Sequence, residues 1–72
     1  VALDGGLDGL SEIRKVIYKS SELIKKNGKL ILEIGFDQKN KIIKILKKEG
    51  FYINSTHKDF AKKDRCIVCT KL

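Results

Sequence analysis

Two cysteines three residues apart are the first residues of this chain whose type and spacing could support chemistry. Cys66 and Cys69 form a Cys-x-x-Cys pair, a spacing typical of redox-active and metal-binding sites. The surrounding segment, residues 65–70, has the composition of a strand, and residues three apart on a strand point to opposite faces. A zinc site needs about four ligands, and His57 is the one histidine. We therefore predict two structural cysteines and no metal site.

Two glycine-containing segments have part of the pattern of a ligand-binding loop. The segment LEIG at residues 32–35 resembles the acidic-glycine opening of an S-adenosylmethionine site, but Phe36 follows where further glycines are needed. The segment GGLDG at residues 5–9 lacks a preceding strand, and the carboxylates of Asp4 and Asp8 would repel a phosphate. We interpret neither as a complete ligand loop. Because one histidine supports no specific Ser-His-Asp or Cys-His arrangement, we assign no catalytic residue.

Length and charge limit the chain to a small, basic domain. Its 72 residues allow one domain at most, and a domain of this size is only marginally stable. The net charge of +7 is typical of a solubilising lysine face, and contact with RNA is the alternative. Only two arginines and five aromatic residues occur, so the nucleic-acid signal is weak. No apolar run approaches the ~20 residues of a membrane span. Two cysteines in a lysine-rich chain favour a cytoplasmic location.

Hydrophobic periodicity predicts the element order α-β-α-β-β within a single unit, residues 1–72. We expect a helix at residues 9–26, then a strand at 29–34, a second helix at 38–49, and strands at 51–56 and 65–70. The expected apolar stripe of the first helix is Ile13, Val16, Ile17, Leu23 and Ile24, and that of the second is Ile42, Ile45 and Leu46.

Capping residues mark the expected helix ends. Asp8 and Asp37 are the expected N-caps, Gly28 the left-handed residue after the first helix, and Gly50 the stop of the second. Because Ile31 is apolar on the face opposite Leu30, Leu32 and Ile34, we expect the first strand to be covered on both sides. The short last connection predicts an antiparallel final strand in a mixed three-stranded sheet.

Five segments in register resemble the C-terminal end of the peptide chain release factor glutamine N5-methyltransferases, the HemK-type enzymes. They are ALDGGLDGL (2–10), KNG (26–28), LEIGFDQ (32–38), EGF (49–51) and KDFAKKDR (58–65). The resemblance implies the last part of a class I, Rossmann-like methyltransferase fold. In that fold the seventh strand is antiparallel and lies between the fifth and the sixth, so residues 65–70 are expected between 29–34 and 51–56.

The resemblance also implies a function for the parent protein. Such enzymes use S-adenosylmethionine to methylate a glutamine side-chain amide in peptide chain release factors. The glycine-rich cofactor motif and the Asn-Pro-Pro-Tyr substrate motif are missing from this chain, which contains no proline. We therefore expect a fragment that binds no cofactor and is inactive alone.

The resemblance points to a substrate rim and to one strained residue. Ligands of open α/β sheets sit outside the carboxyl ends of the strands, so the expected rim of the complete enzyme is Gly5, Gly6, Asp8, Phe36 and Gln38. The family usually has glycine where this chain has Lys62. If that position needs a positive φ, lysine is strained by roughly 1 kcal/mol.

Three alternatives remain open from sequence. The chain could be an autonomous basic module that binds RNA or ribosomes, or part of another class I methyltransferase. It could also be an interaction domain, since the first strand would have an open apolar edge through which copies could self-associate.

Overall fold

The computed structural model describes residues 10–35 and 37–72. Two helices and three strands follow one another in the predicted order. They are α1 (Ser11–Leu23), β1 (Lys29–Glu33), α2 (Lys39–Lys48), β2 (Phe51–Lys58) and β3 (Asp64–Lys71). The last two strands are longer than predicted, so the charged connection between them shortens to residues 59–63.

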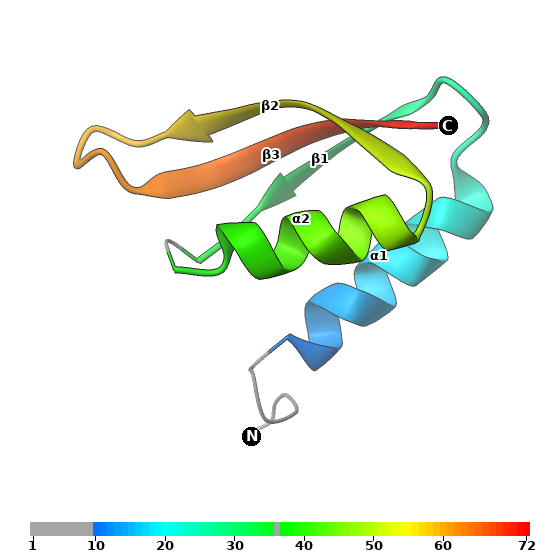
Figure 1. The fold of residues 1–72 in the computed structure, drawn as a ribbon, viewed down its shortest axis with the longest axis horizontal. Coiled ribbons are helices and arrows are strands. Elements are labelled where there is room, and N and C mark those ends of the chain that lie inside the picture. Colours follow the sequence, from blue (N-terminus) through cyan, green and yellow to red (C-terminus); the bar gives the residue numbers. More distant parts are fainter. Residues whose placement is uncertain (1–9, 36) are drawn as a thin grey trace.

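The three strands form one sheet in the order β1-β3-β2, with β3 antiparallel to both neighbours (Figure 1). Consequently β1 and β2 run in the same direction without pairing with each other. This confirms the predicted antiparallel last strand and the central position that the family resemblance implies for it. The prediction of a mixed sheet is wrong for the described residues, because both strand pairs are antiparallel. Within the described residues β1 pairs only with β3, so its other edge is open.

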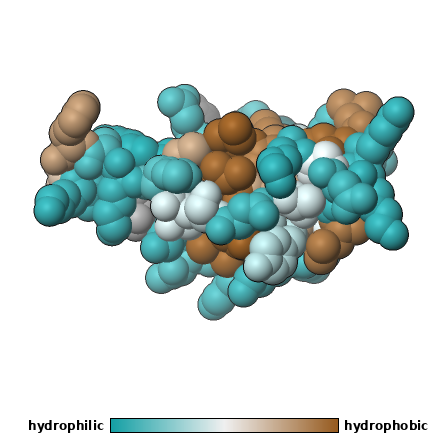
Figure 2. Space-filling view, turned by 90° about the horizontal axis from the view of Figure 1, so that it is seen from above, coloured by the Kyte–Doolittle hydropathy of each residue, from teal (hydrophilic) through white to brown (hydrophobic). Residues whose placement is uncertain are grey.

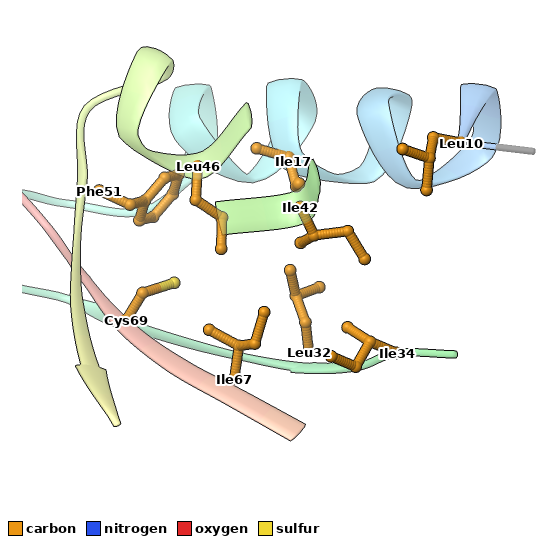
Figure 3. Close-up of a cluster of buried hydrophobic side chains, with 9 residues drawn as sticks. All are labelled: Leu10, Ile17, Leu32, Ile34, Ile42, Leu46, Phe51, Ile67 and Cys69. Atoms are coloured by element: carbon orange, nitrogen blue, oxygen red, sulfur yellow. The ribbon is translucent and has the colours of Figure 1, made fainter. Parts of the chain in front are cut away.

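Both helices cover one face of the sheet, and the core lies between the two layers (Figure 3). Nine apolar residues are buried there: Leu10, Ile17, Leu32, Ile34, Ile42, Leu46, Phe51, Ile67 and Cys69. Ile42 and Leu46, four residues apart on one face of α2, are fully buried as predicted, and Ile45 is half-buried beside them. No polar or charged side chain of the described residues is buried.

The apolar stripe of α1 is narrower than predicted. Ile17 is fully buried and Ile13 packs against the core, but Val16 is 47% exposed and Leu23 is 74% exposed. The helical rotation of about 100° per residue explains the difference. It places Leu10, Ile13 and Ile17 on one face, whereas Val16 and Leu23 lie together on the flank.

Four predicted helix ends need correction. Helix α1 ends at Leu23, because Ile24 is already extended, and its N-cap is Leu10; Asp8 lies outside the described residues. Gln38, not Asp37, is the N-cap of α2.

The residue with a left-handed conformation after α1 is Asn27 (φ 72°), not Gly28. A Cβ on Gly28 would lie 2.5 Å from Cγ2 of Ile24, so this glycine permits close packing instead.

The prediction that β1 is covered on both sides is wrong for this chain. Ile31 is 65% exposed, because both helices pack on the opposite face. Its partner across the sheet is Val68, which is only half-buried. The space-filling view in Figure 2 shows how hydrophobic groups reach the surface between hydrophilic ones.

Candidate functional site

The candidate site is the loop that connects the end of β1 to the start of α2. Ile34 is the last residue held to the sheet, since its N–H donates to the Arg65 carbonyl at 2.8 Å. The chain then turns at Gly35, and Gln38 closes this turn with two hydrogen bonds. The Gln38 N–H donates to the Gly35 carbonyl, and the Gly35 N–H donates to Oε1 of Gln38, both at 3.0 Å.

These two hydrogen bonds explain why this loop needs both residues. A Cβ on Gly35 would lie 2.9 Å from Oε1 of Gln38, so a larger residue would displace the amide from the Gly35 N–H. The side chain of Gln38 is half-buried and makes no capping bond to α2. Gln38 therefore acts on the loop and holds its conformation, while its main chain starts the helix.

A shallow hollow of about 420 Å³ lies beside this loop, lined by Glu33, Ile34 and Arg65. The Arg65 side chain forms an ion pair with Asp59, with its Nε 2.8 Å from Oδ2 of that carboxylate. The other carboxylate oxygen of Asp59 accepts hydrogen bonds from the N–H groups of Ala61 and Lys63. The hydrogen bond from Arg65 and these two backbone bonds lower the pKa of Asp59.

The loop closed by Asp59 contains the predicted strained residue. Lys62 has φ 63°, a left-handed conformation that favours glycine, and its N–H donates to the Asp59 carbonyl at 2.9 Å. The condition under which lysine is strained at this position, a positive φ, is therefore met.

The two cysteines lie on opposite faces of β3, as predicted. Cys69 is fully buried in the core and Cys66 is half-buried on the outer face, and neither forms a disulfide. Burial raises the pKa of the Cys69 thiol, so it is a structural group and not a reactive thiolate. No cluster of three metal-ligating side chains occurs in the part of the chain that the structure describes.

Of the five expected rim residues, the structure describes only Gln38. Gly5, Gly6, Asp8 and Phe36 lie outside the described residues. The one backbone N–H that Gly35 offers is already bonded to Gln38, so this donor is not available to a ligand in the observed conformation. Gln38 lies at the turn that follows the carboxyl end of β1.

Sequence reasoning missed a second feature, a groove between the helices. It is lined by Arg14 and Tyr18 of α1 and by Lys44, Ile45, Lys48 and Glu49 at the end of α2. On the sequence alone, the lysines of the second helix indicate a hydrated face. The signal available was the four-residue spacing of Arg14 to Tyr18 and of Lys44 to Lys48, which places each pair on one side of its helix.

Comparisons with known proteins match nearly the whole chain to one kind of enzyme. It is 39% identical over 71 residues to the release factor glutamine methyltransferase of Clostridium acetobutylicum, covering 99% of this chain and 25% of the relative. The corresponding protein of Clostridium botulinum is 41% identical over 97% of this chain and 25% of the relative. A bifunctional methyltransferase of Rickettsia felis is 35% identical over 94% of this chain and 13% of its own length.

The chain thus spans at most about a quarter of the length of these relatives. No family model and no solved structure matches it. Among the described residues no helix has the length and apolar character to cross a membrane. The matches confirm the resemblance of the five motifs: this chain is the counterpart of a segment of the release factor glutamine methyltransferases.

Proposed function

We propose that this chain is the sheet-edge segment of a cytoplasmic enzyme that methylates the side-chain amide of a glutamine in peptide chain release factors. S-adenosylmethionine would supply the methyl group. The observation that carries the proposal is the match over 99% of the chain to a release factor glutamine methyltransferase. The chain supplies no catalytic residue in this proposal; its role is to build one wall of the site.

The proposed fold of the complete enzyme is the class I methyltransferase sheet. The order β1-β3-β2 with an antiparallel central strand supports it. The open edge of β1 is where the parallel strands of the parent would continue, since unpaired backbone groups on an edge strand bind a further strand. The exposed Ile31 and its partner Val68 would then lie under that remaining part.

The proposed role of the β1–α2 loop is to present the substrate rim. The loop leaves β1 at its carboxyl end, the end at which ligands of open α/β sheets bind. Gln38 is the positioning residue, because it holds Gly35 through both hydrogen bonds. Phe36 lies between them in sequence and, with Gly5, Gly6 and Asp8, completes the proposed rim.

The test of the rim uses the complete enzyme that contains this segment. Gln38→Ala should lower kcat/KM toward a release factor by about tenfold, equivalent to about 1.4 kcal/mol of lost positioning. The Kd for S-adenosylmethionine should not change. Asn40→Ala is the matched control, an exposed amide on the first turn of α2. Equal kinetics of the Gln38 variant and the wild type would remove Gln38 from the rim.

A second test concerns the isolated 72-residue chain. Titration calorimetry should detect no binding of S-adenosylmethionine, because the Gly35 donor is occupied within the chain. Micromolar binding would show that the segment LEIG is a cofactor loop after all and would overturn this assignment of roles.

A further inference from the structure

The groove between α1 and α2 is a cavity of about 410 Å³ on the side of the helices, within the size range of small-ligand sites. The two helices pack against each other (Figure 1), and both contribute residues to the lining of the groove. Its floor is apolar: Ile45 is half-buried, and Tyr18 is 57% exposed although it is a large aromatic residue. Aromatic side chains exposed beside a groove are typical of binding surfaces.

The rim of the groove is cationic. Arg14, Lys44 and Lys48 contribute three positive charges and Glu49 one negative charge. Within residues 10–35 and 37–72, the side chains of Lys44 and Lys48 have no ion-pair or hydrogen-bond partner. These two charges are therefore available to a partner.

The other lysines of α2 add to the positive charge around the groove. Helix α2, KNKIIKILKK, carries five lysines and no acidic residue. The whole chain has a net charge of +7. The groove has an apolar floor and lies in a positively charged region of the surface. It is therefore complementary to a peptide segment that carries both large aliphatic and acidic side chains.

We propose that the α1–α2 groove binds an acidic, amphipathic peptide segment of a partner protein. Its apolar side chains pack on Ile45 and Tyr18, and its carboxylates pair with Lys44 and Lys48. A peptide fits better than RNA, because the floor of the groove is apolar where a phosphate backbone needs cations. The inference does not rest on the proposed methyltransferase activity, since the groove belongs wholly to this chain.

The test measures fluorescence anisotropy of a labelled peptide with leucines at helical spacing and glutamates elsewhere. The peptide is titrated with the 72-residue chain at low salt. Two further probes are the same peptide with lysine in place of glutamate, and an oligouridylate of the same net charge as the acidic peptide. The acidic peptide should bind, the basic peptide should not, and the oligouridylate should bind at least about tenfold more weakly.

Two matched variants locate the binding surface. Lys48→Glu should weaken peptide binding by about tenfold, while Lys47→Glu should change it by less than about twofold. Both lysines are exposed in the last turn of α2, so they share the same helix-dipole environment, but only Lys48 lines the groove. Circular dichroism confirms that each variant is folded, and Lys48→Gln replaces Lys48→Glu if the latter does not fold. Tyr18→Ser should also weaken binding, by about threefold.

Three results would overturn the proposal. Equal losses for the Lys47 and Lys48 variants would show a general charge effect without a groove. Tighter binding of the oligouridylate would identify a nucleic-acid surface. Absence of peptide binding at low salt, where charge attraction is strongest, would remove the groove as a docking site.

Discussion

The two faces of the sheet differ in what covers them, although their sequences are similarly apolar near the centre. On the inner face, Leu32 and Ile67 lie beneath the helices and are buried. On the outer face, Ile31 and Val68 pair across the same two strands, yet Ile31 is mostly exposed. Alternation along a strand therefore indicates which residues share a face, but it does not indicate whether that face has a cover.

The outer face also carries a row of polar side chains, which form hydrogen bonds with one another although no helix covers them. The ammonium group of Lys29 donates to Oγ1 of Thr70 at 3.0 Å, and that hydroxyl donates to Oδ1 of Asn54 at 2.6 Å. Ser55 and His57 interact at 3.0 Å on the same strand as Asn54. The outer face thus combines a small apolar centre with hydrogen-bonded polar residues, whereas the buried residues of the inner face are all apolar.

The largest expected effect tests the difference between the faces directly. Ile42→Ala, against the inner face, should lower the free energy of unfolding by about 2–4 kcal/mol through lost burial and a cavity. Ile31→Ala, on the outer face, should lower it by less than about 1 kcal/mol. Urea unfolding followed by circular dichroism measures both.

Because a domain of this size is marginally stable, Ile42→Ala can unfold it outright. Ile42→Val, with an expected loss of about 0.5–1.5 kcal/mol, keeps the comparison measurable in that case. Equal losses at positions 31 and 42 would mean that the outer face is covered in solution.

A double-mutant cycle tests the geometry of the β1–α2 loop. Gly35→Ala should destabilise the chain by about 1 kcal/mol, because the added Cβ displaces Gln38 and leaves the Gly35 N–H without its acceptor. In a Gln38→Ala background the same change should be nearly neutral, since the acceptor is already gone. The coupling of about 1 kcal/mol comes from four urea titrations, and additive losses would contradict the loop geometry.

Relief of backbone strain should have a smaller effect with the opposite sign. Lys62→Gly should stabilise the chain by about 0.5–1 kcal/mol, because glycine adopts φ 63° without steric conflict. Asn27→Gly should give only a few tenths of a kcal/mol, since asparagine tolerates the left-handed region. Lys62→Ala is the control and should give no gain; a gain equal to that of glycine would point to lost charge repulsion instead.

The smallest expected effect is a pH dependence from Asp59. Its pKa is lowered in the folded chain, first by the hydrogen bond from Arg65. The unfolded state therefore binds more protons at acidic pH. The stabilisation is complete above the ordinary pKa of 3.8 and is lost as the pH falls through the lower folded value. Asp59→Asn should flatten this part of the stability curve, measured by urea unfolding between neutral and acidic pH. An unchanged curve would show that the ion pair with Arg65 is not formed in solution.

The order of the elements follows from the sequence because each depends on local chemistry. Three local signals show this: the four-residue spacing of Ile42 and Leu46, the strand composition around Cys66 and Cys69, and the helix end at Gly50. Each signal involves residues only a few positions apart. The left-handed conformation of Lys62 could be anticipated only from the family resemblance, because nothing in the sequence around a lysine indicates a positive φ.

The remaining features depend on contacts between distant segments. The turn at Asn27 and Gly28 is held to Lys71 near the other end of the chain by two backbone hydrogen bonds. Whether Ile31 is buried is decided by which face of the sheet the helices cover. The α1–α2 groove exists only because two helices far apart in sequence pack together. By itself, then, the sequence determined the helices, the strands and the sides of β3 on which its cysteines lie. Only the tertiary structure decided which of these surfaces meet and which stay open, because burial depends on the partner surface as well as on the residue.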